Sequence, residues 1–104
     1  MQSLECFPEK FRRALHAFLQ ALEENFGNNL SVYLFGSLAR GDYLLNSDID
    51  LIIVTDRLKG LKPWERTAKL RRMAPEDVGL DILGYTEEEF QRAKKYLEPM
   101  VKIR

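Results

Sequence analysis

The first third of the chain changes from a helical to a strand-like pattern of apolar residues. Apolar residues recur every three or four positions, as in a helix with one buried face, at Phe11, Leu15, Phe18, Leu19, Leu22 and Phe26. Pro8 suits the first turn of this helix, and Gly27 suits its end. The apolar run 30–35 then predicts a short buried strand, and we expect a short helix over 38–43.

The middle of the chain predicts two strands joined by a helix. Residues 49–54 are β-branched and largely apolar, as expected of a central strand. After a turn-rich connection, Pro63 opens a helix that we expect to reach about Met73. The apolar run 78–83 predicts the next strand, which one carboxylate, Asp81, interrupts.

The C-terminal part predicts a capped helix and a short strand. Thr86 and Glu89 form a capping box for a helix that reaches about Leu97, and 100–103 forms a terminal strand. Because helices and strands alternate along the chain, we expect an α/β fold of the α+β type, with a mixed β-sheet flanked by helices. The length and the lack of an internal repeat predict a single domain, 1–104.

Composition excludes several classes of protein. With 45% apolar and 31% charged residues, the chain is neither disordered nor embedded in a membrane. Basic and acidic residues number 16 each, so the formal net charge is zero. This neutrality weakens the case for a nucleic-acid partner held by bulk electrostatics. A lone cysteine, Cys6, suits a reducing compartment. With no signal-peptide pattern and no run of about 20 apolar residues, the sequence predicts a cytoplasmic protein without a membrane partner.

Two aspartates stand at the start of the predicted central strand. Asp48 and Asp50 are two residues apart, so in an extended strand they project to one face while Ile49 and Leu51 enter the core. Two carboxylates on one face repel each other and lose solvation, and a divalent cation removes both costs. Mg²⁺ prefers such oxygen ligands together with substrate phosphates. We therefore expect Mg²⁺, or alternatively Mn²⁺, at this position.

Asp81 extends the pair to a triad. A carboxylate within an apolar run is out of place without a partner. If the strand that contains Asp81 lies beside the central strand, Asp81 joins Asp48 and Asp50. Three carboxylates can hold two metal ions about 3.5 to 4 Å apart, an arrangement that serves in-line phosphoryl displacement. Asp48, Asp50 and Asp81 are therefore the expected metal ligands and catalytic residues, with Asp81 on the side of the attacking hydroxyl.

A second group of residues suits a phosphate. Gly36 follows a strand, where the missing side chain lets the backbone approach a phosphate closely. Ser37 adds a hydroxyl donor, and Arg40, one turn later, can reach a phosphate or tie the loop to a nearby carboxylate. The expected ligand is the triphosphate of ATP or another nucleoside triphosphate.

Each feature also has a structural interpretation. A Gly-Ser pair alone is most often a turn, and an Asp-x-Asp alone is most often a solvated loop end. For Arg40 a structural salt bridge is about as good an explanation as a phosphate contact. The basic helix residues Arg66, Lys69, Arg71 and Arg72 suit a solvated face best, with a partner or nucleotide role as the alternative. The combination of these features in this order is what favours a site.

At these motifs the sequence resembles the minimal nucleotidyltransferases of the polymerase-β-like nucleotidyltransferase superfamily, along nearly its whole length. The matching motifs are Gly36-Ser37 with its extension Ala39-Arg40-Gly41, then Ser47-Asp48-Ile49-Asp50-Leu51, then Asp81. The resemblance implies nucleotide contacts from Gly36, Ser37, Arg40 and Ser47, and metal and catalytic roles for Asp48, Asp50 and Asp81. It also implies transfer of a nucleoside monophosphate to a hydroxyl.

The resemblance further implies a protein partner. Minimal members are commonly encoded beside a helical HEPN-domain protein, a ribonuclease toxin, and act as the antitoxin by adding AMP to a tyrosine of that toxin. The short length also leads us to expect that another chain supplies the second wall of the cleft, and a homo-oligomer is an open alternative. Transfer to a small molecule or a nucleic-acid end stays open, as does a non-catalytic module that neutralises its partner by occlusion.

Overall fold

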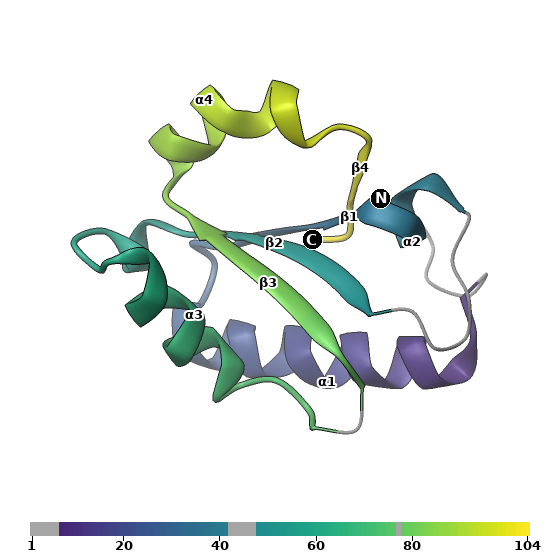
Figure 1. Cartoon of the computed structure of the whole chain (residues 1–104). Helices are drawn as coiled ribbons and strands as arrows, with labels where there is room; N and C mark the ends of the chain where they lie inside the picture. The colour runs from purple at the N-terminus through teal and green to yellow at the C-terminus, as the bar shows by residue number, and fades with distance from the viewer. Residues whose placement is uncertain (1–6, 42–47, 77) are drawn as a thin grey trace.

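The structure, a computed structural model, describes residues 7–41, 48–76 and 78–104 (Figure 1). Helices and strands alternate along these segments. In chain order they are α1 (Glu9–Phe26), β1 (Ser31–Phe35), α2 (Gly36–Arg40), β2 (Ile49–Val54), the 3-10 turn η1 (Asp56–Leu58), α3 (Pro63–Arg71), β3 (Leu80–Tyr85), α4 (Glu87–Leu97) and β4 (Met100–Lys102).

The strands form one mixed sheet in the order β3-β2-β1-β4. β1 runs antiparallel to both β2 and β4, whereas β2 and β3 are parallel. A parallel pair needs a long crossover connection, and the segment that contains η1 and α3 supplies it. The expected mixed sheet flanked by helices is therefore confirmed.

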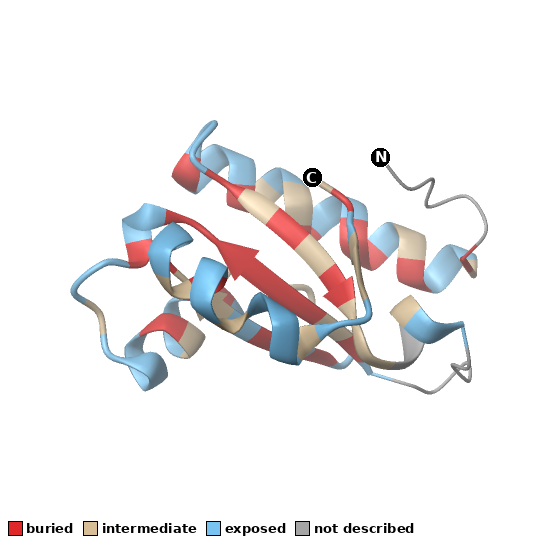
Figure 2. Cartoon of the chain, turned by 90° about the horizontal axis from the view of Figure 1, so that it is seen from above, coloured by how far each residue is buried: buried red, intermediate tan, exposed pale blue. Residues whose placement is uncertain are grey.

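One face of the sheet is covered by α1, and α3 packs on the same side (Figure 1). The apolar stripe that the sequence predicted on α1 is buried, with Phe11, Leu15, Phe18 and Leu22 at most 1% exposed. β2 is buried along nearly its whole length, which places it at the centre of the fold (Figure 2). Each large apolar side chain buried here stabilises the fold by about 1.5 to 3 kcal/mol, so this layer fixes the position of β2.

Within the described segments, the opposite face is covered only in part, by α4. Phe90 of α4 stacks on Tyr33 of β1 with ring centroids 4.7 Å apart, and it packs with the buried Ile52 and Val54 of β2. Asp50, on the same face of β2, lies outside this apolar cluster. The part of the sheet near the start of β2 is thereby left for polar chemistry.

Several boundaries differ from the sequence-based expectation. β1 begins at Ser31 rather than 30, α3 ends at Arg71 rather than near Met73, and β4 ends at Lys102 rather than 103. β3 spans Leu80–Tyr85 rather than 78–83, because it pairs in register with the whole of β2, from Ile49 opposite Leu80 to Val54 opposite Tyr85. α2 spans Gly36–Arg40 rather than 38–43, so the helix begins directly where β1 ends. The region 42–47 lies outside the described residues.

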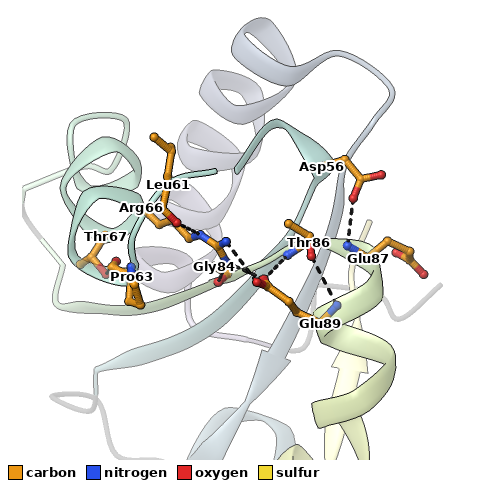
Figure 3. A network of polar contacts seen from close by, with 9 residues as sticks. All are labelled: Asp56, Leu61, Pro63, Arg66, Thr67, Gly84, Thr86, Glu87 and Glu89. Carbon is orange, nitrogen blue, oxygen red and sulfur yellow. Dashed lines mark hydrogen bonds and ion pairs between the residues drawn. The ribbon is translucent and has the colours of Figure 1, made fainter. Parts of the chain in front are cut away.

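Arg66 is the main correction on α3, since we expected a solvated side chain. It is only 8% exposed and lies one turn before the buried Leu70, on the inner face of the helix. Its guanidinium donates to the carbonyls of Leu61 (3.0 Å) and Gly84 (3.2 Å) and pairs with both carboxylate oxygens of Glu89 (Figure 3). Arg66 thus joins α3, β3 and α4 through one side chain.

Glu89 serves two structures at once. It pairs with Arg66, and its Oε1 also accepts from the backbone N–H of Thr86 (2.8 Å), while Thr86 Oγ1 accepts from the N–H of Glu89 (3.3 Å). The predicted capping box is therefore present. The Arg66 hydrogen bond, followed by the backbone bond from Thr86, lowers the pKa of Glu89 to about 2.

None of the helices in the described segments is long and apolar enough to cross a membrane.

The first prediction concerns Glu89→Gln, which keeps the capping acceptor and removes the charge. The pKa of Glu89 is about 4.5 in the unfolded chain and about 2 in the folded chain, so its stabilisation is full above pH 4.5 and disappears as the pH falls towards 2. Because the side chain is 35% exposed, we expect a loss of only about 1 to 2 kcal/mol at pH 7, shrinking as the pH falls. Urea unfolding at several pH values measures it.

Glu88→Gln is the matched control, because Glu88 makes only an exposed pair with Arg92 one turn away on α4. Its free energy of unfolding should change by less than about 0.5 kcal/mol at every pH. Equal losses in the two variants would contradict the role given to the Arg66 pair.

Candidate active site

The centre of the candidate site is a pair of aspartates on neighbouring parallel strands. Asp50 of β2 and Asp81 of β3 are register partners, so their side chains leave the sheet side by side on one face. The residues on either side of them, Ile49, Leu51, Leu80 and Ile82, are at most 5% exposed and point to the α1 side. The alternation of each strand therefore directs both carboxylates to the other face.

Asp48 lies just before β2 and is exposed. Its carboxylate packs over Gly79, the residue before β3: a Cβ at Gly79 would overlap Asp48 Oδ1 and lie 2.9 Å from its Cγ. Gly79 is thus the residue that makes room for Asp48, and we did not single it out from the sequence. Its signal there is a glycine inside the predicted strand 78–83, a position where another group often approaches the backbone closely.

Gly36 makes room for Asp50 in the same way. It joins β1 to α2 with a φ of +67°, a backbone conformation that favours glycine. A Cβ at Gly36 would overlap Asp50 Oδ2 and lie 3.0 Å from its Cγ. The glycine that the sequence assigned to phosphate approach therefore also packs directly against a carboxylate of the triad.

The electrostatics of Asp50 reflect its two acidic neighbours. Burial raises its pKa, and the charge of Asp81, a hydrogen bond with Asp81 and the charge of Asp48 raise it further. Arg40, in the last turn of α2, acts in the opposite direction by favouring the charged form. Asp48, Asp81 and Arg40 are thus all close enough to Asp50 for their charges to matter, as the sequence led us to expect.

The donor chemistry of this cluster fits a divalent cation. Three carboxylates offer hard oxygen ligands, and the repulsion that raises the pKa of Asp50 is what a cation would relieve. Among the described residues, no three acidic, histidine or cysteine side chains already surround a common metal position. The carboxylates of Asp48 and Asp50 lie over different glycines, so a cation would have to draw them together.

The remaining expected nucleotide contacts are placed only in part. The backbone of Ser37 belongs to α2, directly after Gly36. Arg40 is exposed at the end of that short helix, on the side of Asp50. Ser47 lies outside the described residues.

Comparison with known proteins agrees with this geometry. A family profile described as "Nucleotidyltransferase domain" matches residues 15–103, nearly the whole described chain. The chain therefore belongs to the nucleotidyltransferase domain family.

Several relatives carry a more specific name. The protein adenylyltransferase MntA of Shewanella oneidensis is 35% identical over 63 residues, which cover 60% of this chain and 45% of that protein. Two proteins of Methanocaldococcus jannaschii, provisionally named protein adenylyltransferases, are 44% identical over 91 residues and 47% identical over 45 residues. These matches cover 84% and 42% of this chain and 61% and 45% of the relatives. The chain thus spans between about half and three fifths of the length of these relatives.

Solved structures agree on the fold. A protein from Sulfolobus solfataricus, provisionally named a nucleotidyltransferase, superposes with a TM-score of 0.64 at 25% identity, over 96% of this chain and 90% of that one. A second structure with the same provisional name gives a TM-score of 0.59 at 20% identity, over 93% of this chain and 100% of that one, which supports the fold alone.

The second prediction compares Gly36→Ala with Gly27→Ala. Both glycines have a positive φ near 65°, but a Cβ at Gly27 meets nothing within 4 Å, whereas at Gly36 it overlaps Asp50. We expect both variants to lose about 1 kcal/mol or more of stability from backbone strain. Only Gly36→Ala should lose Mg²⁺-dependent binding of ATP, as measured by calorimetry. If Gly36→Ala still binds ATP with Mg²⁺, Gly36 is not part of the nucleotide site.

The third prediction concerns Asp81→Asn without metal. The substitution removes a charge that opposes ionisation of Asp50 but keeps a side chain able to hydrogen-bond to it. We expect the metal-free variant to be at least as stable as the parent, since functional sites hold strain at the expense of stability. Thermal and urea unfolding in EDTA measure this. A loss of more than about 1 kcal/mol would make Asp81 a structural residue instead.

Proposed function

We propose that this chain is a Mg²⁺-dependent nucleotidyltransferase that moves AMP from ATP to a hydroxyl of a partner protein. The observation that carries the proposal is the register pair Asp50–Asp81, with Gly36 packed against Asp50 and Asp48 beside it. Three exposed or half-exposed carboxylates at the uncovered end of a sheet serve no packing purpose. Catalysis of nucleotidyl transfer, in contrast, needs such a charge centre.

The proposed reaction is an in-line displacement at the α-phosphorus of ATP. The acceptor oxygen forms a bond to that phosphorus, the bond to the bridging oxygen of pyrophosphate breaks, and pyrophosphate leaves. The acceptor proton passes to a carboxylate oxygen of Asp81. Asp48, Asp50 and Asp81 would hold Mg²⁺, which when bound supplies neutralisation of the triphosphate and a lower pKa of the attacking hydroxyl.

The residues of the chain contribute mainly position and charge. Asp50 is fixed by its buried neighbours on β2, and Asp81 by its pairing to β2, so their relative placement depends on the sheet rather than on a loop. Arg40 lies on the side of Asp50, where its charge also suits the phosphates of the nucleotide. Gly36, and with it Ser37, is proposed to contact the triphosphate next to Asp50.

Two observations favour a protein as the acceptor. The relatives with the most specific names are called protein adenylyltransferases. The chain has no net charge, so it has little bulk attraction for a polynucleotide. By the resemblance to minimal nucleotidyltransferases, the proposed acceptor is a tyrosine of a HEPN-domain toxin, with this chain as the antitoxin, acting in the cytoplasm.

The fourth prediction tests this transfer. The chain is incubated with the proposed acceptor, a purified helical HEPN-domain protein, together with Mg²⁺ and ATP. The helical protein is then weighed by intact mass spectrometry. We expect an increase equal to one AMP unit or more, with pyrophosphate released in the same amount. The modified residue should be a tyrosine, identified by peptide fragmentation.

Asp48→Asn is the negative control for chemistry, and Glu88→Gln, on an exposed face of α4, is the matched control for surface charge. The mass increase should vanish with the first variant and persist with the second. If the mass of the helical protein does not increase, although a tight complex forms and its activity is still blocked, this chain would be a module that acts by occlusion rather than an enzyme. If labelled AMP is found on RNA or on a small molecule instead, the acceptor would not be a protein.

A further inference from the structure

A groove lies between α3 and α4, over the edge strand β3. Its volume is about 350 Å³, and its walls and floor include Pro63 and Thr67 of α3, Leu83 and Tyr85 of β3, and Glu89 of α4. Figure 3 shows Pro63 and Thr67 on one side and Glu89 on the other, with Gly84 between them. The groove is thus built from secondary structure, and the Arg66–Glu89 pair sets the spacing of its two walls.

Leu83 is the unusual residue of this groove. It is 39% exposed, and among the large apolar side chains that the described segments leave exposed it is the one on the sheet; Trp64 and Tyr96 are on helices. Its position follows from the sheet order, because β3 is an edge strand, and the apolar cluster around Phe90 of α4 includes Tyr85 of β3 but not Leu83. An exposed leucine on a sheet face lowers its free energy when an apolar group covers it.

The groove lies next to the candidate active site along β3, since its lining reaches Leu83. Leu83 is two residues after Asp81, so the two side chains leave the same face of β3 about 6.5 to 7 Å apart. That is about the length of a tyrosine residue from its Cα to its hydroxyl oxygen. An aromatic side chain over Leu83 can therefore place a terminal hydroxyl at Asp81.

The charges of the groove exclude a polyphosphate there. Arg66 and Glu89, the charged residues that line it, neutralise each other through two contacts. A nucleotide triphosphate or a polynucleotide backbone would find no unpaired cation among the described lining residues. An uncharged, apolar group is the complementary occupant.

We propose, resting on the proposed function, that this groove seats the acceptor side chain and makes the enzyme selective for tyrosine. Tyrosine combines an apolar ring with a hydroxyl at its far end, whereas serine and threonine carry their hydroxyl next to the backbone. The ring lies on Leu83 and against Pro63 and Thr67 of α3, and the phenol oxygen faces Asp81. Its oxygen bonds to the α-phosphorus of ATP, pyrophosphate leaves, and the phenol proton goes to the Asp81 carboxylate.

Recognition in this groove acts on the side chain rather than by addition of a strand. The carbonyl of Tyr85 accepts from Thr55 of the β2 side, so the carbonyl of Gly84 points to the free edge of β3. Arg66 already donates to that carbonyl. The partner segment therefore needs an exposed tyrosine and no particular backbone conformation.

The fifth prediction uses capped pentapeptides, four glycines around a central tyrosine, phenylalanine or serine, as probes. Methyl NMR of the full chain with Mg²⁺ and a non-hydrolysable ATP analogue should show saturable shifts at the Leu83 methyls with the tyrosine and phenylalanine peptides and none with serine. With ATP, the tyrosine peptide alone should gain AMP. Leu83→Glu should lower the affinity for the tyrosine peptide by about tenfold or more, since a buried leucine contact of roughly 1.5 to 3 kcal/mol is lost.

Thr67→Phe fills the groove from α3 and leaves the residues of the sheet unchanged. It should weaken binding of the peptide in the same way if Leu83→Glu disturbs folding. Tyr96→Glu is the control, because Tyr96 is 77% exposed and lies outside the groove. Affinity for ATP with Mg²⁺ should change less than about twofold in all three variants.

Several outcomes would overturn the groove. One is that the Leu83 methyl signals shift with nucleotide alone. Another is that Tyr96→Glu loses as much affinity for the tyrosine peptide as Leu83→Glu. A third is that a chain which still binds ATP with Mg²⁺ shows no peptide binding at millimolar concentration. If the parent chain does not bind ATP in the presence of metal, the result counts against the proposed function instead. The Leu83 methyl signals report peptide binding separately from this test.

Discussion

The rest of the site depends on one constraint: two carboxylates, Asp50 and Asp81, stand side by side on parallel strands. Each is flanked along its strand by fully or nearly buried apolar residues that pack on α1, so neither side chain can turn away without moving the core. Burial raises the pKa of Asp50, and the neighbouring charge of Asp81 raises it further. The hydrophobic layer beneath the sheet therefore holds together charges that would separate in water.

Small residues around this pair complete the geometry. Gly36 and Gly79 leave room for the carboxylates of Asp50 and Asp48. Gly36 lies at the junction of β1 and α2, and Gly79 directly precedes β3. Beyond Asp81 the same strand face continues as an apolar surface at Leu83. The carboxylate of Asp81 and the apolar surface at Leu83 thus lie next to each other on one strand. Between them is Ile82, whose side chain points into the core.

Much of this was predictable from the sequence, for identifiable reasons. Strong periodicity on α1 and the β-branched run of β2 predict those elements, and the capping box predicts the start of α4. The spacing of Asp48, Asp50 and Asp81 predicts a carboxylate cluster once β2 and β3 are neighbours. The ends of β3 and the roles of Gly79 and Arg66 were missed, because they depend on strand register and on helix packing, which local patterns do not encode. Two signals were nevertheless present: Gly79 interrupts the predicted strand 78–83, and Arg66 shares a helical face with Leu70.

The bond from Arg66 to Gly84 also bears on how the chain behaves at high concentration. An edge strand with open carbonyls can pair with the edge of another molecule and start aggregation, and natural proteins protect such edges with charged side chains. Here a guanidinium occupies the Gly84 carbonyl on the free side of β3. Substitution of Arg66 would therefore do more than lower stability: it would leave an apolar strand, with Leu83 beside it, open to self-association.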